Sequence, residues 1–117
     1  GDDAMLMHLG ALATIASQKP KNFHHILMNN KVHESVGGQS TAAKHVDMSS
    51  IVRSVGNNDI FSAKAPNELK EKIKTFVKSI GPSFLEVQIR PGSRDELGRP
   101  TIKPLQNKIN FMNFINK

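Results

Sequence analysis

A helical stripe of apolar side chains between two strand-like segments is the feature that most limits how this chain can fold. Apolar residues recur at spacings of four, three, one and three in and just after the segment 67–79, at Leu69, Ile73, Phe76, Val77 and Ile80. Lysines and a glutamate fill the other side, which is typical of an amphipathic helix with one buried face. Short runs at Ile60–Ser62 and Phe84–Ile89 flank this segment and favour strands. This succession predicts a parallel sheet that helices cover on both faces.

The first half of the sequence repeats the alternation of helix and strand. Residues 4–18 are apolar nearly all round, so we expect a buried helix that covers most of 5–17 and ends before Pro20. The apolar run His25–Met28 then predicts a buried strand, which leads directly into the polar pair Asn29-Asn30.

The remaining segments add one short helix, two loops and a terminal helix. Asp47 is a favourable N-cap for a short helix, and Gly56 is suited to end it. Residues 31–46 contain a Gly-Gly pair and several hydroxyl residues, so we expect them to be mostly irregular. Residues 91–104 are rich in Pro, Gly and Arg and predict a loop, after which apolar residues indicate a terminal helix.

Length and composition place these elements in one globular domain. A chain of 117 residues can bury a core of its own, so we predict a single domain over residues 1–117. The expected fold is a three-layer α/β/α sandwich with a mainly parallel sheet, in which the strand that should precede Gly1 is missing. The contents of 38% hydrophobic and 22% charged residues are those of an ordinary globular protein.

Composition also narrows the expected partners. No apolar run approaches the roughly 18 residues of a membrane span, so we expect no membrane partner. The net charge of +6 is dispersed without three consecutive basic residues, and Trp and Tyr are absent, so we expect no nucleic-acid partner. The absence of cysteine excludes disulfides, thiolate nucleophiles and cysteine-ligated metal centres, and we expect a cytoplasmic protein.

Two polar loops adjoin the apolar segments of the first half. Gly1-Asp2-Asp3 lies directly before the first expected helix, and Asn29-Asn30 follows after twenty-five intervening residues. Carboxylate and amide oxygens suit Mg²⁺, and the starts of helices attract anions. Taken alone, an acidic loop and a distant asparagine pair are common features of proteins.

Several longer segments give the two loops a context, because they resemble the diphosphate-binding domain of the phosphonopyruvate decarboxylases. The resemblance covers nearly the whole chain and is carried by residues 7–15, Asn29-Asn30, and residues 33–39, 90–94 and 97–101. The acidic loop and the double asparagine mark enzymes that use thiamine diphosphate in general, whereas the segment 33–39 narrows the family. Sulfopyruvate decarboxylases, which in some organisms carry their two domains on separate chains, are the alternative.

The resemblance implies a set of ligands for thiamine diphosphate and Mg²⁺. Asp2 would supply a carboxylate oxygen to the metal, Asn30 its side-chain carbonyl, and Val32 its backbone carbonyl. The backbone N–H groups of Asp3 and Ala4 would meet the phosphates.

Two positions depart from the family pattern, which usually has glycine where this chain has Asp3 and Lys31. Asp3 would add a negative charge beside an anionic diphosphate, although Lys31 could neutralise that charge if the two loops are adjacent. A module that keeps the fold and has lost the cofactor is therefore an alternative function.

The resemblance implies decarboxylation of 3-phosphonopyruvate to phosphonoacetaldehyde and carbon dioxide. In this class a glutamate on the pyrimidine-binding domain activates the cofactor, generally across a subunit interface. We expect that domain as the partner, a homo-oligomer in the full-length protein, and no activity from this chain alone. Since the chain begins inside a ligand loop and lacks an initiator Met, we expect it to be the carboxy-terminal piece of a larger enzyme.

The remaining titratable residues offer weaker candidates. His33 and Glu34 follow the metal loop and are candidates for the active site, with a loop-ordering hydrogen bond as the alternative. His8 is expected to be structural or to contact cofactor or substrate, and His45 to lie on the surface. His24 and His25 alternate across a strand and cannot share a metal ion. Three arginines are expected in a solvated loop or an interface, with a phosphonate contact as the alternative, namely Arg90, Arg94 and Arg99.

Overall fold

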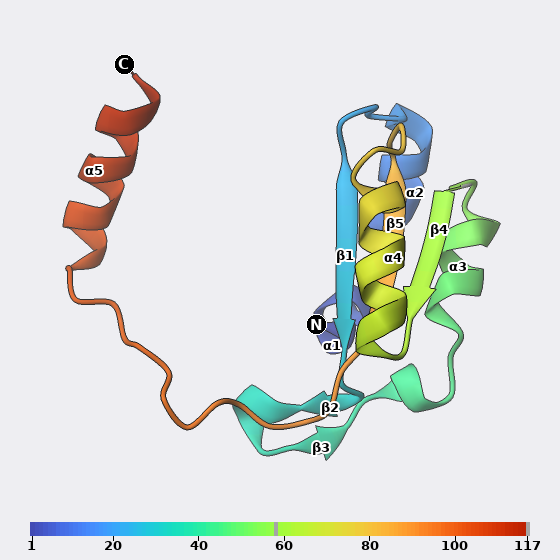
Figure 1. Cartoon of the computed structure of the whole chain (residues 1–117), viewed down its shortest axis with the longest axis horizontal. Coiled ribbons are helices and arrows are strands. Elements are labelled where there is room, and N and C mark those ends of the chain that lie inside the picture. Colours follow the sequence, from blue (N-terminus) through green and yellow to red (C-terminus); the bar gives the residue numbers. More distant parts are fainter. Residues whose placement is uncertain (58, 117) are drawn as a thin grey trace.

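The computed structural model describes residues 1–57 and 59–116, and its centre is a three-stranded parallel sheet (Figure 1). The strands are β1 (His24–Asn29), β5 (Ser83–Gln88) and β4 (Asp59–Ala63), with β5 between the other two. His24 and Asp59 both pair with Ser83, so the three strands start at the same level. All three predicted strands are therefore confirmed, and their carboxyl ends meet at one edge of the sheet.

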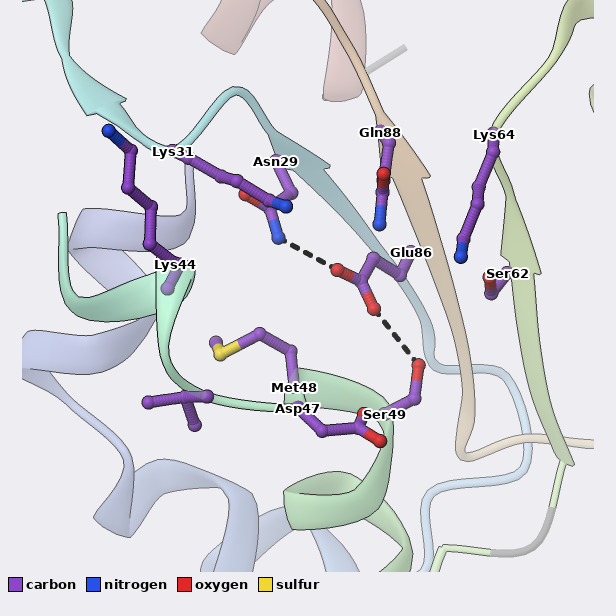
Figure 2. Close-up of a pocket in the computed structure, with 12 residues that line it drawn as sticks. Asn29, Lys31, Lys44, Asp47, Met48, Ser49, Ser62, Lys64, Glu86 and Gln88 are labelled. Carbon is purple, nitrogen blue, oxygen red and sulfur yellow. Dashed lines mark hydrogen bonds between the residues drawn. The ribbon is translucent and has the colours of Figure 1, made fainter. Parts of the chain in front are cut away.

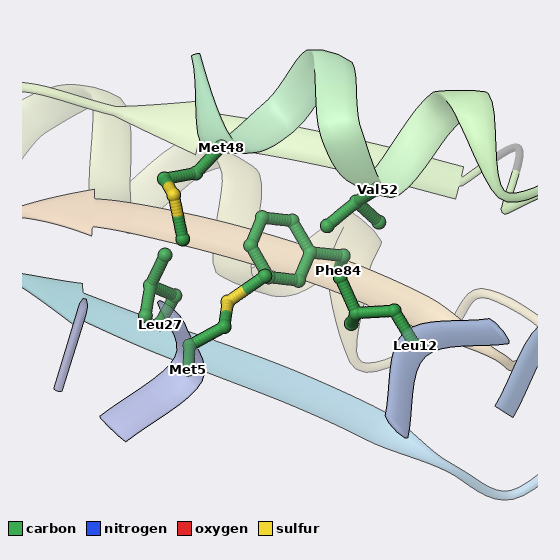
Figure 3. Close-up of a cluster of buried hydrophobic side chains, with 6 residues drawn as sticks. All are labelled: Met5, Leu12, Leu27, Met48, Val52 and Phe84. Atoms are coloured by element: carbon green, nitrogen blue, oxygen red, sulfur yellow. The ribbon is translucent and has the colours of Figure 1, made fainter. Parts of the chain in front are cut away.

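Three short helices cover one face of this sheet. They are α1 (Asp2–Met7), α2 (Gly10–Gln18) and α3 (Met48–Ser54). Their apolar side chains meet those of β1 and β5 in one buried cluster (Figure 3), made of Met5, Leu12, Leu27, Met48, Val52 and Phe84. This cluster fixes the amino end of α1 and the loop before α3 near the carboxyl edge.

The helix α4 (Pro66–Phe76) covers the other face. Pro66 stands in its first turn, where proline is tolerated, and Phe76 packs with Leu85 and Val87 in a second buried cluster. The predicted stripe is confirmed in its first part, with Leu69 packed against this cluster. The helix covers most of residues 67–79, as predicted, and ends at Phe76, after which the chain passes into tight turns and leaves Val77 exposed.

Helices cover most of residues 5–17 as predicted, but they are two short helices with one buried side each, where a single buried helix was expected. The chain turns at His8, whose N–H donates to the Met5 carbonyl, and α2 starts two residues later. In the two helices Asp2, Met5, Leu12 and Ala16 are buried, whereas Met7 is 70% exposed. Since the sheet lies on one side only, the small alanine side chains of the other side face solvent at little cost.

Helices cover both faces of the sheet in its middle, but they leave one face of β1 uncovered. The side chains of Ile26 and Met28 point to the α4 face of β1 and are each 45% exposed. Within the described residues β1 pairs only with β5, so it is an edge strand.

The short helix after Asp47 is confirmed, since the Asp47 side chain accepts a hydrogen bond of 2.9 Å from the Ser50 N–H. Gly56 follows α3 with a φ of 104°, a conformation that favours glycine.

The segment expected to be irregular contains two short paired strands and two single turns of 3₁₀ helix. The strands are β2 (Val32–His33) and β3 (Gln39–Ser40), and the turns are η1 (Glu34–Val36) and η2 (Ala42–Lys44). The terminal helix α5 (Pro104–Ile115) is confirmed and stands apart from the sheet at the end of an extended loop (Figure 1). No helix in the described ranges is long and apolar enough to cross a membrane.

Candidate functional site

The two polar loops lie next to each other at the carboxyl edge of the sheet. A side chain at Gly1 would come within 4.0 Å of the Met28 carbonyl oxygen, so the start of α1 lies beside the end of β1. Thr41 connects the loops, because its hydroxyl donates to Asp2 Oδ2 and its backbone N–H donates to the Lys31 carbonyl over 3.0 Å. The fold thus brings Asp2 close to the Asn30 loop, as expected.

Asp2 is the most unusual side chain of this site. It is fully buried, and its Oδ1 has no hydrogen-bond partner among the described residues. A buried carboxylate oxygen without a donor is costly, and a bound cation is one means of satisfying it. The donor set around Asp2 therefore fits a metal ion.

Asn30 is held in one orientation by two hydrogen bonds. Its Nδ2 donates to Glu34 over 2.5 Å, and its Oδ1 accepts from the Val32 N–H over 3.2 Å. An amide oxygen has two lone pairs, and the Val32 N–H uses only one of them, so Asn30 Oδ1 can still bind a cation. Lys31, which stands between Asn30 and Val32 in the sequence, has a φ of 62°. Glycine adopts this left-handed backbone conformation with less strain than lysine, which explains why glycine suits position 31 better.

Asp3 occupies a donor that a phosphate would use. Its Oδ1 accepts from the Ala4 N–H over 2.8 Å, and its Oδ2 lies 3.1 Å from His33 Nδ1. The Ala4 hydrogen bond, and to a lesser extent His33, hold the pKa of Asp3 below its usual value. The side-chain partner of Asp3 is thus His33, and Lys31 lines a different cavity.

His33 and Glu34 order the loop in this structure. The Glu34 carboxylate accepts from Asn30 and from the Gly92 N–H, so it connects the asparagine loop to the segment before α5. Contacts of this kind correspond to the alternative role expected for these two residues.

The other histidines lie away from these loops or on the surface. His24 Nδ1 lies 2.6 Å from Ser83 Oγ, and the His25 ring packs edge-on against Phe84. Burial lowers the pKa of His25. His8 is exposed, which corrects its expected place on a buried helix, and His45 is exposed as expected. Across residues 1–57 and 59–116, no three His, Asp or Glu side chains are grouped to hold a metal ion.

A second polar cluster, which the sequence did not indicate, lies at the same edge of the sheet. Glu86 is only 8% exposed and accepts from Asn29 Nδ2 over 2.7 Å and from Ser49 Oγ over 3.0 Å (Figure 2). The glutamate had been assigned to a strand with no further role. Its only signal in the sequence is a charged residue between the apolar residues Leu85 and Val87.

Comparison with known proteins assigns the fold and the first loop to a family. Residues 1–87 match the model of the C-terminal TPP binding domain of thiamine pyrophosphate enzymes. The chain belongs to this family. The expected fold class and the expected thiamine diphosphate-binding domain are therefore confirmed.

Proteins similar to this chain include phosphonopyruvate decarboxylases and sulfopyruvate decarboxylase subunits. The chain is 35% identical over 115 residues to a phosphonopyruvate decarboxylase of Streptomyces viridochromogenes, and 34% identical over 114 residues to one of Streptomyces hygroscopicus. These matches cover 98% and 97% of the chain but only 29% and 28% of the relatives. A sulfopyruvate decarboxylase subunit beta of Methanothermobacter thermautotrophicus is 34% identical over 95 residues, which are 81% of the chain and 49% of that subunit.

Proposed function

We propose that this chain is the diphosphate-binding domain of a thiamine diphosphate- and Mg²⁺-dependent decarboxylase that converts 3-phosphonopyruvate to phosphonoacetaldehyde and carbon dioxide. The observation that carries the proposal is the buried Asp2 with its unpartnered oxygen beside the Asn30 loop, within a TPP binding domain. Likeness to two phosphonopyruvate decarboxylases over nearly the whole chain supports the substrate.

In this proposal Mg²⁺ is held by Asp2, Asn30 and the backbone carbonyl of Val32. Asp2 supplies the charged ligand, and burial strengthens its attraction for a cation. Thr41 keeps the Asp2 carboxylate in place through the other oxygen, and Glu34 fixes the Asn30 amide by binding its nitrogen. These two supporting contacts leave Asp2 Oδ1 and Asn30 Oδ1 as the side-chain atoms available to a metal ion.

The diphosphate would approach the backbone N–H groups of Asp3 and Ala4. Because the Asp3 carboxylate now accepts from the Ala4 N–H, it has to turn away before a phosphate oxygen can take that donor. The cofactor therefore fits the metal ligands and competes with Asp3 at the phosphate contact.

When bound, thiamine diphosphate stabilises the carbanion that remains after carbon dioxide leaves a 2-keto acid. This chain binds and orients the diphosphate end. The activating glutamate is proposed to lie on a pyrimidine-binding domain, which another subunit of a homo-oligomer would supply, and the protein is proposed to be cytoplasmic. Without that glutamate, this chain alone would be inactive. His33 and Glu34 stay predicted candidates for facing the active site.

Titration of the full-length protein with thiamine diphosphate and Mg²⁺ in a calorimeter tests the cofactor assignment. We expect saturable binding that depends on Mg²⁺. Folded protein without any binding would indicate the non-catalytic module instead.

Turnover of 3-phosphonopyruvate and 3-sulfopyruvate, measured side by side, tests the substrate assignment. We expect the phosphonate to be preferred in kcat/KM. The specific observation that favours the alternative is the likeness to sulfopyruvate decarboxylase subunit beta, and a preference for the sulfonate would establish it.

A further inference from the structure

A polar cavity of about 330 Å³ lies at the carboxyl edge of the sheet, between the ends of β1, β5 and β4 and the loop before α3 (Figure 2). Its volume is at the small end of the range for ligand sites, and a molecule of a few heavy atoms would share it with several waters. The Asp3–His33 pair described above is not part of its lining.

The floor of the cavity presents hydrogen-bond acceptors. Glu86 lies there with its two oxygens bound to Asn29 and Ser49, and each carboxylate oxygen can accept a further donor. Asn29 is only 3% exposed, and its Oδ1 has no partner among the described residues. Asn29 Nδ2 is committed to Glu86 and its Oδ1 is closed off from the cavity, so Glu86 is the acceptor at the floor.

The upper part of the cavity presents cations and a neutral donor. Lys31 and Lys64 come from two separate segments, and Figure 2 shows their ammonium ends directed inward from opposite sides, with the Gln88 amide between them. Lys44 also lines the cavity, but its Nζ donates to Ser40 over 2.6 Å. Asp47 is held by its hydrogen bonds to Ser50 at the start of α3.

Neither a simple anion nor a simple cation matches both levels of the cavity. An anion suits the two lysines but would place its oxygens against the Glu86 carboxylate. A metal ion or an amine suits the floor but meets two ammonium groups above it. A zwitterion matches both, with an ammonium group on the floor and an anionic group between the lysines.

We propose that this cavity binds a small zwitterion, in which an ammonium group is joined through about two carbons to a carboxylate or sulfonate. Glu86 receives the ammonium group, and Lys31, Lys64 and Gln88 receive the oxyanion. The proposal is independent of the proposed decarboxylase function, because none of these contacts requires cofactor or metal.

A matched series of small molecules tests both ends of the ligand. β-Alanine and taurine carry both groups, whereas propionate lacks the ammonium group and ethylamine lacks the anion. Each is titrated into the full-length protein without cofactor and Mg²⁺, with binding followed by NMR chemical shifts or calorimetry. We expect β-alanine or taurine to bind at least about tenfold more tightly than either truncated molecule, since each lost charge-assisted contact costs about 1.5–3 kcal/mol.

The variant Lys64→Gln tests the location of the site, and Lys70→Gln on the exposed side of α4 is its matched control. We expect Lys64→Gln to weaken zwitterion binding about tenfold and Lys70→Gln to leave it unchanged. Equal binding of propionate or ethylamine, no binding of any zwitterion at 10 mM (about 3 kcal/mol of affinity), or an unaffected Lys64→Gln variant would each overturn the proposal.

Discussion

Two buried carboxylates lie at the same edge of the sheet, and they differ in how their oxygens are satisfied. Glu86 has a protein donor on each oxygen, whereas Asp2 has Thr41 on one oxygen and no partner on the other within the described structure. The neighbouring asparagines follow the same division, since Asn29 serves Glu86 and Asn30 lies in the loop beside Asp2. A carboxylate with two donors stabilises the fold, and one with a free buried oxygen is prepared for a cation.

Removal of the Asp2 carboxylate has the largest expected effect. In the full-length protein, Asp2→Ala should lower the Mg²⁺-dependent affinity for thiamine diphosphate by about a thousandfold, because loss of a buried charged partner costs about 3–5 kcal/mol. Calorimetric titration measures it. The variant should still unfold cooperatively, since it also removes a buried charge that lacks a partner. Wild-type affinity in Asp2→Ala would show that Asp2 is not a metal ligand.

Removal of the Glu86 carboxylate should act on folding instead of on the metal. Glu86→Ala leaves Asn29 Nδ2 and Ser49 Oγ without their acceptor, so the free energy of unfolding should fall by about 3 kcal/mol. Urea unfolding followed by circular dichroism gives this value. Glu86→Gln keeps one acceptor and should lose less. A Glu86→Ala protein of wild-type stability would contradict the structural role assigned to this carboxylate.

Asp3→Gly separates the role of Asp3 from that of its neighbour. Because this change removes a like charge and frees the Ala4 N–H, cofactor affinity should rise about tenfold. The same titration as for Asp2 measures it, and His33→Gln, which removes only the partner of Asp3, serves as the comparison. Unchanged or weaker affinity in Asp3→Gly would mean that the aspartate accommodates the diphosphate.

The smallest expected effect concerns the backbone between the two clusters. Lys31 has a φ of 62°, so Lys31→Gly should raise the free energy of unfolding by about 1 kcal/mol. Lys19, with a φ of 47° at the end of α2, provides a matched control outside both clusters, and Lys19→Gly should give a similar gain. Urea unfolding of both variants measures the gains. A loss of stability in Lys31→Gly alone would show that the lysine side chain contributes contacts that exceed the strain.

Sequence periodicity was sufficient to predict the strands and α4. A helix that buries only one face must carry its apolar residues as a stripe, such as the one from Leu69 to Phe76. For residues 5–17 the sequence pattern predicted helix correctly but missed the division into two helices and their exposed side, because the apolar composition is high while the sheet covers only one side. The break at His8 has no signal of its own, since neither proline nor a glycine stands at that residue.

The candidate site was predictable only where a family motif carried it. Asp2 and Asn30 come from that motif, and the structure places their loops side by side. The contacts of Thr41, and the choice of His33 over Lys31 as the partner of Asp3, depend on how the segment 31–46 folds back over α1. Such side-chain pairings between distant residues leave no periodic pattern in a single sequence.

The exposed flank of β1 has a practical consequence for work with this domain. An unpaired strand edge presents backbone N–H and C=O groups to any other strand, and Ile26 and Met28 add apolar surface beside it. A solution of these 117 residues alone would therefore tend to self-associate through strand addition as concentration rises. Sedimentation at several concentrations would reveal such growth, and an isolated domain is thus a poor substitute for the full-length protein in quantitative titrations.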